Sequence, residues 1–308
     1  LGDPDLTVSN APRRQFNGYV KFWTGLEAPA SSAVPGQGHF PIRCYYDNDS
    51  DELINYRGRD GLVDLGVYRE LLRSLSAMGY NALNPFDQLG RPEFQQWASY
   101  KSRWQFRADP GHIGRLFDLA QEEGFLIEVN LTLGGGPDPL PDDLECWPRF
   151  RVEWLARWKR RLLESPLGRA DLFAFGPRSP IWDSPYRCAC AECVRRGTGA
   201  IMTEVFAALE ELILGHNPRA RLLCDLYFQG LTLWERGGFR VSDRWTLVAA
   251  DNGYGRLILP EAAGKAPFAW GIYLHAGFWL NHSIQDPHLD ALAESIREGA
   301  LAGATCYL

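Results

Sequence analysis

The chain has 308 residues, of which 45% are hydrophobic and 23% are charged, and its formal net charge is −6. This apolar content is ordinary for a globular protein and suffices for one large core. The negative charge and the lack of long basic runs argue against a partner nucleic acid. No apolar stretch approaches the roughly 20 residues of a membrane-spanning helix. The polar residues that follow Leu1 show no targeting pattern, so the compartment is not readable.

Short apolar runs alternate with helical patterns along the chain, which predicts parallel strands joined by helices. The candidate strands are Arg43–Asp47, Tyr80–Phe86, Phe125–Leu131, Asp171–Gly176, Ala220–Phe228, Thr246–Asn252, Phe268–Ala276 and Ala304–Leu308. The candidate helices are Val67–Met78, Ile113–Glu123, Phe150–Glu164, Ala200–Leu214, Leu231–Gly237 and Leu289–Ala302. Gly79 and Gly124 directly follow two of these helices and are typical C-cap residues. The connection Gly253–Pro267 shows no strong helical pattern.

Eight strands with helical crossovers favour a (β/α)₈ TIM barrel, an α/β fold, over residues 41–308. The alternative, an open doubly wound sheet, usually has fewer strands and often a Gly-rich phosphate loop after the first one. Here the first strand is followed by Asn48-Asp49-Ser50 instead. Residues 1–40, with a strand-like run Gly18–Trp23, are predicted to be a separate N-terminal segment, the remnant of a preceding domain or linker. Since no initiator Met is present, we expect the chain to be a domain excised from a longer protein.

Polar and aromatic residues gather at the carboxyl ends of the predicted strands, where barrel enzymes hold their active sites. The candidate substrate-binding residues are Asp47, Asn84, Asp87, Asn130, Tyr227, Gln229, Asn252, Tyr254, Arg256, Tyr273, His275 and Trp279. Structural roles stay open for them, because an Asp at a strand end often caps the following helix and a lone His is often a core residue. The aromatic content of 13% suits either stacking on sugar rings or an ordinary core.

Hydrolysis of a glycosidic bond needs two carboxyl groups, or one and an activated water, on opposite sides of that bond. The acids near the predicted site are Asp47, Asp87, Glu128, Asp183, Asp225, Asp251 and Asp286. In an ideal strand Asp225, Tyr227 and Gln229 share one face, whereas Asp251 and Asn252 point opposite ways. Glu128 lies mid-strand, where a carboxylate must be paired or neutral, and it either faces the barrel interior or pairs with an Arg on a helix.

Three cysteines, Cys188, Cys190 and Cys193, lie close together in the loop after the fourth predicted strand. Thiols at this spacing bind zinc if a fourth ligand comes from elsewhere, such as Cys146 or a His. Because the motif lacks a partner pair, a loop-tethering disulfide or free thiols are favoured over a metal. The seven cysteines are odd in number and cannot all pair within the chain. We therefore predict no cofactor and no metal.

Two segments in the last third of the chain carry a resemblance to a known family. The run from Leu233 to Asp243 leads into a strand that is followed by Arg256 and then Leu259-Pro260, and Gly271-Ile-Tyr-Leu-His275 comes further downstream. In order and spacing, these segments resemble family 115 glycoside hydrolases, the α-glucuronidases, over about residues 220–308.

The resemblance implies an inverting hydrolase that removes uronic acid side groups from a plant polysaccharide without a metal. It also implies sugar contacts for Asn252, Tyr254, Arg256, Tyr273 and His275. An anionic sugar needs a positive partner, and Arg256 supplies a guanidinium suited to a carboxylate.

The chain departs from the family pattern at two positions. Gln229 stands where the family has a Glu after the fifth strand, and Ala250 stands where it has the first of two Asp residues. Since a Gln side chain cannot serve as an acid or base, Asp251 and Asp225 are the nearest replacements and are predicted to be the catalytic pair.

The sequence thus predicts a glycoside hydrolase that acts on a carbohydrate, its expected partner, with the oligomeric state left open. One alternative is a carbohydrate-binding barrel that has lost the catalytic acids. Another is a different barrel enzyme, such as a lyase or a metal-dependent hydrolase, although the usual His-x-His pair after the first strand is missing.

Overall fold

A computed structural model describes residues 40–46, 63–84, 110–131, 146–164, 166–176, 188–227, 229–252, 255–260, 263, 267–275 and 289–308. Its strands are β1 (Ile42–Tyr46), β2 (Ala82–Asn84), β3 (Leu126–Leu131), β4 (Leu172–Phe175), β5 (Arg221–Leu226), β6 (Trp245–Ala250), β7 (Trp270–Tyr273) and β8 (Cys306–Tyr307). Each strand pairs in parallel with the next one, and β8 pairs with β1, so the sheet closes into a barrel. The predicted (β/α)₈ fold is confirmed.

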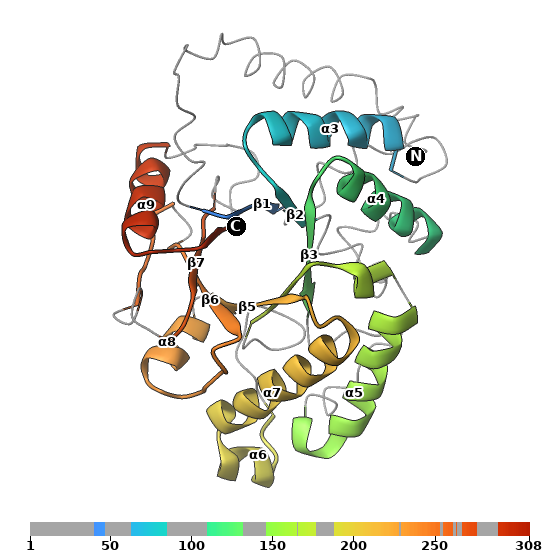
Figure 1. The fold of residues 1–308 in the computed structure, drawn as a ribbon. Helices are drawn as coiled ribbons and strands as arrows, with labels where there is room; N and C mark the ends of the chain where they lie inside the picture. The colour runs from blue at the N-terminus through green and yellow to red at the C-terminus, as the bar shows by residue number, and fades with distance from the viewer. Residues whose placement is uncertain are drawn as a thin grey trace, which may run out of the picture.

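Helices surround the strands on the outside of the barrel (Figure 1). They are α3 (Leu65–Ala77), α4 (Pro110–Glu122), α5 (Trp147–Glu164), the 3₁₀ helix η4 (Pro166–Arg169), α6 (Ala191–Arg196), α7 (Thr198–His216), α8 (Gln229–Glu235) and α9 (Leu289–Leu301). Each helix predicted from the sequence is present, with its ends shifted by a few residues. Gly79 and Gly124 follow α3 and α4 with φ angles of 93° and 85°, which glycine adopts without strain, as their C-cap assignment predicts.

One short helix was missed by the sequence prediction, and one connection lacks a helix as predicted. The short helix α6 was not predicted, because its six residues carry too little periodicity to be recognised. Between β6 and β7, the described residues contain no helix, in agreement with the prediction for Gly253–Pro267.

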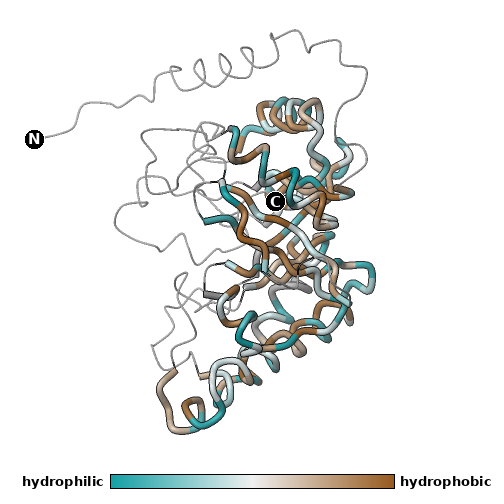
Figure 2. The backbone as a smooth tube through the Cα atoms, turned by 90° about the vertical axis from the view of Figure 1, so that its left-hand side faces the viewer, coloured by the Kyte–Doolittle hydropathy of each residue, from teal (hydrophilic) through white to brown (hydrophobic). Residues whose placement is uncertain are grey.

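Alternation along the strands sorts their side chains into two layers. Alternate positions form the packed interior of the barrel: Ile42, Cys44, Ala82, Leu172, Ala174, Leu223, Val248, Ala250 and Cys306. The intervening positions face outward and join the larger core beneath the helices, where Phe206 of α7 meets Trp245 of β6 with ring centroids 4.8 Å apart. Figure 2 shows the hydrophobic strands running through the middle of the molecule. The barrel is therefore a filled core rather than a pore.

The described part of the chain begins at Phe40, which is buried against Ile272, Leu274 and Ala304. Residues 1–39, including the run Gly18–Trp23, lie outside the described residues, so the division of the chain at residue 40 stays a prediction. Among the described helices, none combines the length and the apolar character that crossing a bilayer requires.

Candidate functional site

The interior face of β5, continued past its last residue, carries two of the predicted site residues. Asp225 is paired in register with Val248 of β6, which in turn is paired with Gly271 of β7. Two positions further along, Tyr227 and Tyr273 follow on the same face and reach the carboxyl end of the barrel. Asp225 and Tyr227 therefore share one face, as alternation predicts, and Asp225 lies one step deeper in the barrel than the tyrosines.

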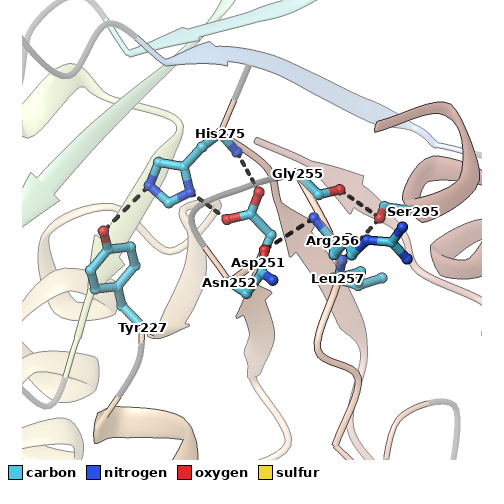
Figure 3. A network of polar contacts seen from close by, with 8 residues as sticks. All are labelled: Tyr227, Asp251, Asn252, Gly255, Arg256, Leu257, His275 and Ser295. Atoms are coloured by element: carbon cyan, nitrogen blue, oxygen red, sulfur yellow. Dashed lines mark hydrogen bonds and ion pairs between the residues drawn. The ribbon is translucent and has the colours of Figure 1, made fainter. Parts of the chain in front are cut away.

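Three side chains form a hydrogen-bonded chain at this rim (Figure 3). His275 Nδ1 lies 2.5 Å from Asp251 Oδ1, and the backbone N–H of His275 donates to Asp251 Oδ2 at 3.0 Å. On the other side of the ring, Nε2 lies 3.3 Å from the Tyr227 hydroxyl. The Asp251 side chain has no exposed surface and the His275 side chain is 6% exposed.

The two carboxylate oxygens of Asp251 both accept hydrogen bonds from His275, so they hold the imidazole ring in one orientation. When Nδ1 carries the proton that Asp251 accepts, Nε2 is the free lone pair and accepts the Tyr227 O–H. The arrangement connects a buried carboxylate to a phenol through an imidazole, and such a chain can pass a proton toward the rim.

The chain segment after β6 positions Asp251. Its backbone N–H donates to Tyr273 O at 2.9 Å and extends the β6–β7 ladder by one residue. The chain then folds back, because Asp251 forms an antiparallel bridge with Leu257 and the N–H of Asn252 donates to Arg256 O at 3.0 Å. Asn252 Oδ1 accepts the N–H of Arg256 at 3.3 Å, so this amide closes the turn.

Helix α9 anchors this turn through one buried residue, Ser295, that the sequence analysis missed. Its hydroxyl donates to Gly255 O at 2.7 Å and accepts the N–H of Leu257 at 2.9 Å. A serine in a helix usually faces water, so nothing in the local pattern of α9 indicates this role. Gly255 has a φ of 75°, and a Cβ there would lie 3.0 Å from the Leu292 side chain, which explains why glycine occupies the turn.

Aromatic rings pack around His275. The ring centroids of Tyr273 and Tyr227 lie 4.9 Å and 5.6 Å from that of His275, and the two tyrosine rings meet at a centroid distance of 6.1 Å. Tyr273 and Tyr227 are only 9% and 8% exposed, so most of each ring is covered by other residues. Their packing adds rigidity to the imidazole, and rigid positioning is what a proton-transfer group requires.

A second polar group lies within the barrel. Glu128 has no exposed surface, and its Oε2 lies 3.7 Å from Cys44 Sγ, so this carboxyl group faces the interior rather than an outer helix. Burial, with Glu128 as the second cause, raises the pKa of Cys44 well above its usual value, and burial raises that of Cys306 to about 12. Asn84 is also buried, and its side-chain amide group has no hydrogen-bond partner among the residues that the structure describes.

The remaining predicted residues divide into two groups. Asn130 belongs to β3, and Gln229 begins α8, so position 229 lies beyond the end of β5 rather than within the strand. Several predicted residues lie outside the described part of the chain: Asp47, Asp87, Asp183, Tyr254, Trp279 and Asp286. The catalytic and sugar-binding roles of all these residues stay predictions.

The predicted cysteine group is joined by a fourth cysteine. The Sγ atoms of Cys146, Cys188, Cys190 and Cys193 all lie within 4.8 Å of one another. Burial raises the pKa of Cys146, whereas the backbone N–H of Cys193 lowers the pKa of Cys190 to about 7. All seven cysteines of the chain are among the described residues, and all are free thiols.

A surface groove of about 550 Å³ lies between α5 and α7, on the outside of the barrel. Its charged lining includes Arg151, Lys159 and Glu211. No residue from a strand end contributes to it, so it is not the candidate active site.

No protein-family model matches the sequence, and no curated protein matches it. Solved structures match its fold. A family GH115 4-O-methyl-α-glucuronidase with specificity for decorated arabinogalactans superposes with a TM-score of 0.61 at 14% identity, over 87% of this chain and 36% of that one. A mutant O-GlcNAc hydrolase of Thermobaculum terrenum has a TM-score of 0.52 at 9% identity, over 87% of this chain and 54% of that one.

A third match, the Flavobacterium johnsoniae chitobiase, has a TM-score of 0.50 at 13% identity, over 87% of this chain and 44% of that one. At such identities the similarity shows the fold alone, and that fold is the barrel that these glycoside hydrolases contain. This chain spans 36% to 54% of the length of the three matched chains.

Proposed function

We propose that this chain is a glycoside hydrolase whose active site lies at the carboxyl ends of β5, β6 and β7. The observation that carries the proposal is the hydrogen-bonded series Tyr227–His275–Asp251. It is a buried arrangement suited to proton transfer, at the end of the barrel where such enzymes hold their catalytic groups. A side chain that moves a proton in the transition state contributes roughly 10²–10⁴-fold to a rate.

Within this proposal the two predicted carboxylates have different roles. Both oxygens of Asp251 accept hydrogen bonds from His275, so Asp251 is a positioning residue. Protons then move through the imidazole and the Tyr227 hydroxyl. Asp225 is 6% exposed on the interior face below Tyr227, and it is the carboxyl group proposed to act at the glycosidic bond, together with an activated water.

The proposed substrate is a polysaccharide decorated with uronic acid. Two observations support this choice: the barrel of a 4-O-methyl-α-glucuronidase has the same fold, and an exposed arginine, Arg256, lies on the turn that follows Asp251. A guanidinium binds a sugar carboxylate through two parallel hydrogen bonds. The backbone N–H of Arg256 donates to Asn252, and the residue is exposed, so a ligand in solvent can reach it.

A carbohydrate-binding barrel without hydrolytic activity is the second candidate. It is favoured by the full use of the Asp251 oxygens within the protein and by Gln229 in the place of the family's Glu. In this case the rim binds a sugar, but no carboxyl group reaches the glycosidic bond.

The test is turnover of aryl glycosides of uronic acids and of neutral sugars by the purified chain. We expect turnover by the wild type, a loss of about 100-fold or more in Asp251→Asn and Asp225→Asn, and no change in Asp243→Asn, which alters an exposed turn. Arg256→Ala should weaken turnover of the uronic acid substrates and spare the neutral ones. Sugar binding without any turnover would instead establish the second candidate, and the absence of both would refute the site.

A further inference from the structure

The four-cysteine cluster is the strongest feature that the proposed glycosidase site does not use. Its members come from two stretches of the chain: Cys146 directly precedes α5, and the other three lie at the start of α6. Cys146 Sγ lies 3.6 Å from Cys190 Sγ and 3.7 Å from Cys193 Sγ. Along the chain, α5, η4 and β4 lie between the two stretches, so the fold itself brings the four thiols together.

These separations match the edge of a thiolate tetrahedron. Zinc binds cysteine sulfur at about 2.3 Å, and four sulfurs arranged tetrahedrally at that distance lie about 3.8 Å from one another. A disulfide instead needs its sulfurs at about 2.05 Å, and it joins two cysteines rather than four. The cluster thus has the size and number of ligands of a metal site.

We propose that Cys146, Cys188, Cys190 and Cys193 bind one zinc ion. The four thiols release their protons to the surrounding water as the zinc–sulfur bonds form, and the thiolates fill every position of the tetrahedron. No position is left for water or substrate, so the site is structural. This assignment replaces the disulfide or free thiols that the sequence favoured, because the sequence could not show that Cys146 supplies the fourth ligand.

The contacts around the cluster suit this role. The backbone N–H of Cys193 points at Cys190 Sγ at 3.4 Å, and an N–H donor of this kind stabilises a metal-bound thiolate. Cys146 and Cys193 are buried, and Cys190 is exposed, so a metal can enter from the surface. The ion would join the beginning of α5 to the beginning of α6, the elements that follow β3 and β4, and would stabilise this flank of the carboxyl-end rim.

The proposal is tested on the full chain purified from cells grown with zinc. Elemental analysis should find about one zinc per chain in the wild type and in the control Cys224→Ala, which removes a buried cysteine of β5 and keeps the four ligands. Cys190→Ser should bind zinc at least ten-fold more weakly in competition with a chromophoric chelator. Because Cys190 is exposed, this substitution removes no buried surface and the variant should fold.

Two further measurements separate zinc from the other states of the thiols. Cobalt added to the zinc-depleted chain should produce thiolate-to-metal charge transfer and the visible bands of a tetrahedral site. The charge transfer should be weaker in Cys190→Ser, which keeps three thiolates. A strong chelator should lower the unfolding temperature of the wild type by more than that of Cys190→Ser. The proposal is overturned by a zinc-free chain whose four thiols react freely with a disulfide reagent, by a mass lower by two hydrogens per disulfide, or by iron in place of zinc.

Discussion

The coupling between Asp251 and His275 can be measured without a substrate. Asp251→Asn leaves one oxygen for the backbone N–H of His275 and turns an NH₂ group toward Nδ1–H, so two donors face each other unless the ring changes its tautomer. A hydrogen bond to a charged group contributes about 1.5–3 kcal/mol. We therefore expect Asp251→Asn to lower the free energy of unfolding by about 2 kcal/mol.

The partner variant is His275→Phe, which keeps a ring between the tyrosines and removes both nitrogens. It leaves the buried Asp251 carboxylate without the Nδ1–H donor, which should cost about 3 kcal/mol. In the double variant the neutral amide no longer needs that donor. The double loss should therefore be smaller than the sum of the single losses, by about 2 kcal/mol.

The assay is urea unfolding of the four proteins followed by circular dichroism, with Asp243→Asn as the matched control on an exposed turn. The control should change stability by less than about 0.5 kcal/mol. If the loss of unfolding free energy in the double variant equals the sum of the two single losses within about 0.5 kcal/mol, the two side chains are energetically independent. That result would refute the proposed proton transfer through Asp251 and His275.

Two further predictions concern the framework around the site. In α7, Gly199→Ala should lower the free energy of unfolding in urea by about 3 kcal/mol, because the added Cβ would lie 1.3 Å from Gly238 O. The matched control is Gly215→Ala in the same helix. Its Cβ would meet no atom within 4 Å, so this substitution should raise the free energy of unfolding by up to about 1 kcal/mol. Equal effects of the two alanines would show that the close approach to Gly238 is not rigid. Ser295→Ala should cost about 2 kcal/mol and increase hydrogen exchange at the Leu257 amide, which loses its acceptor, and unchanged exchange there would contradict the anchoring of the turn by α9.

The sequence resemblance to α-glucuronidases and the superposition of the barrels both support the fold. Neither identifies the catalytic residues of this chain. Gln229 illustrates the difference. In sequence it stands at the family's Glu position, but in the structure it begins α8, where the chain has already left the strand. A replacement at such a position leaves the paired strands of the barrel unchanged, so the shared fold does not fix the chemistry.

Much of the architecture could be read from the order of residues along the chain. Strand and helix periodicities are local, the glycines at 79 and 124 end helices because of their own backbone freedom, and parallel strands in succession require helical crossovers. These facts led to the closed barrel, and the strand ends stay the predicted place of the site. They also put Asp225 and Tyr227 on one face, because alternation within a strand needs no knowledge of distant residues.

The partners of the side chains came from the folded chain instead. Asp251 meets His275 across 24 positions, Leu257 meets Ser295 across 38, and Cys146 meets Cys190 across 44. Past the end of a strand, a side chain points where turns and neighbouring elements direct it, and neither leaves a periodic mark in the sequence. Asp251 is thereby tied to an imidazole, and a cysteine ahead of α5 completes a set of four thiols, because the closing of the barrel brings these distant segments together.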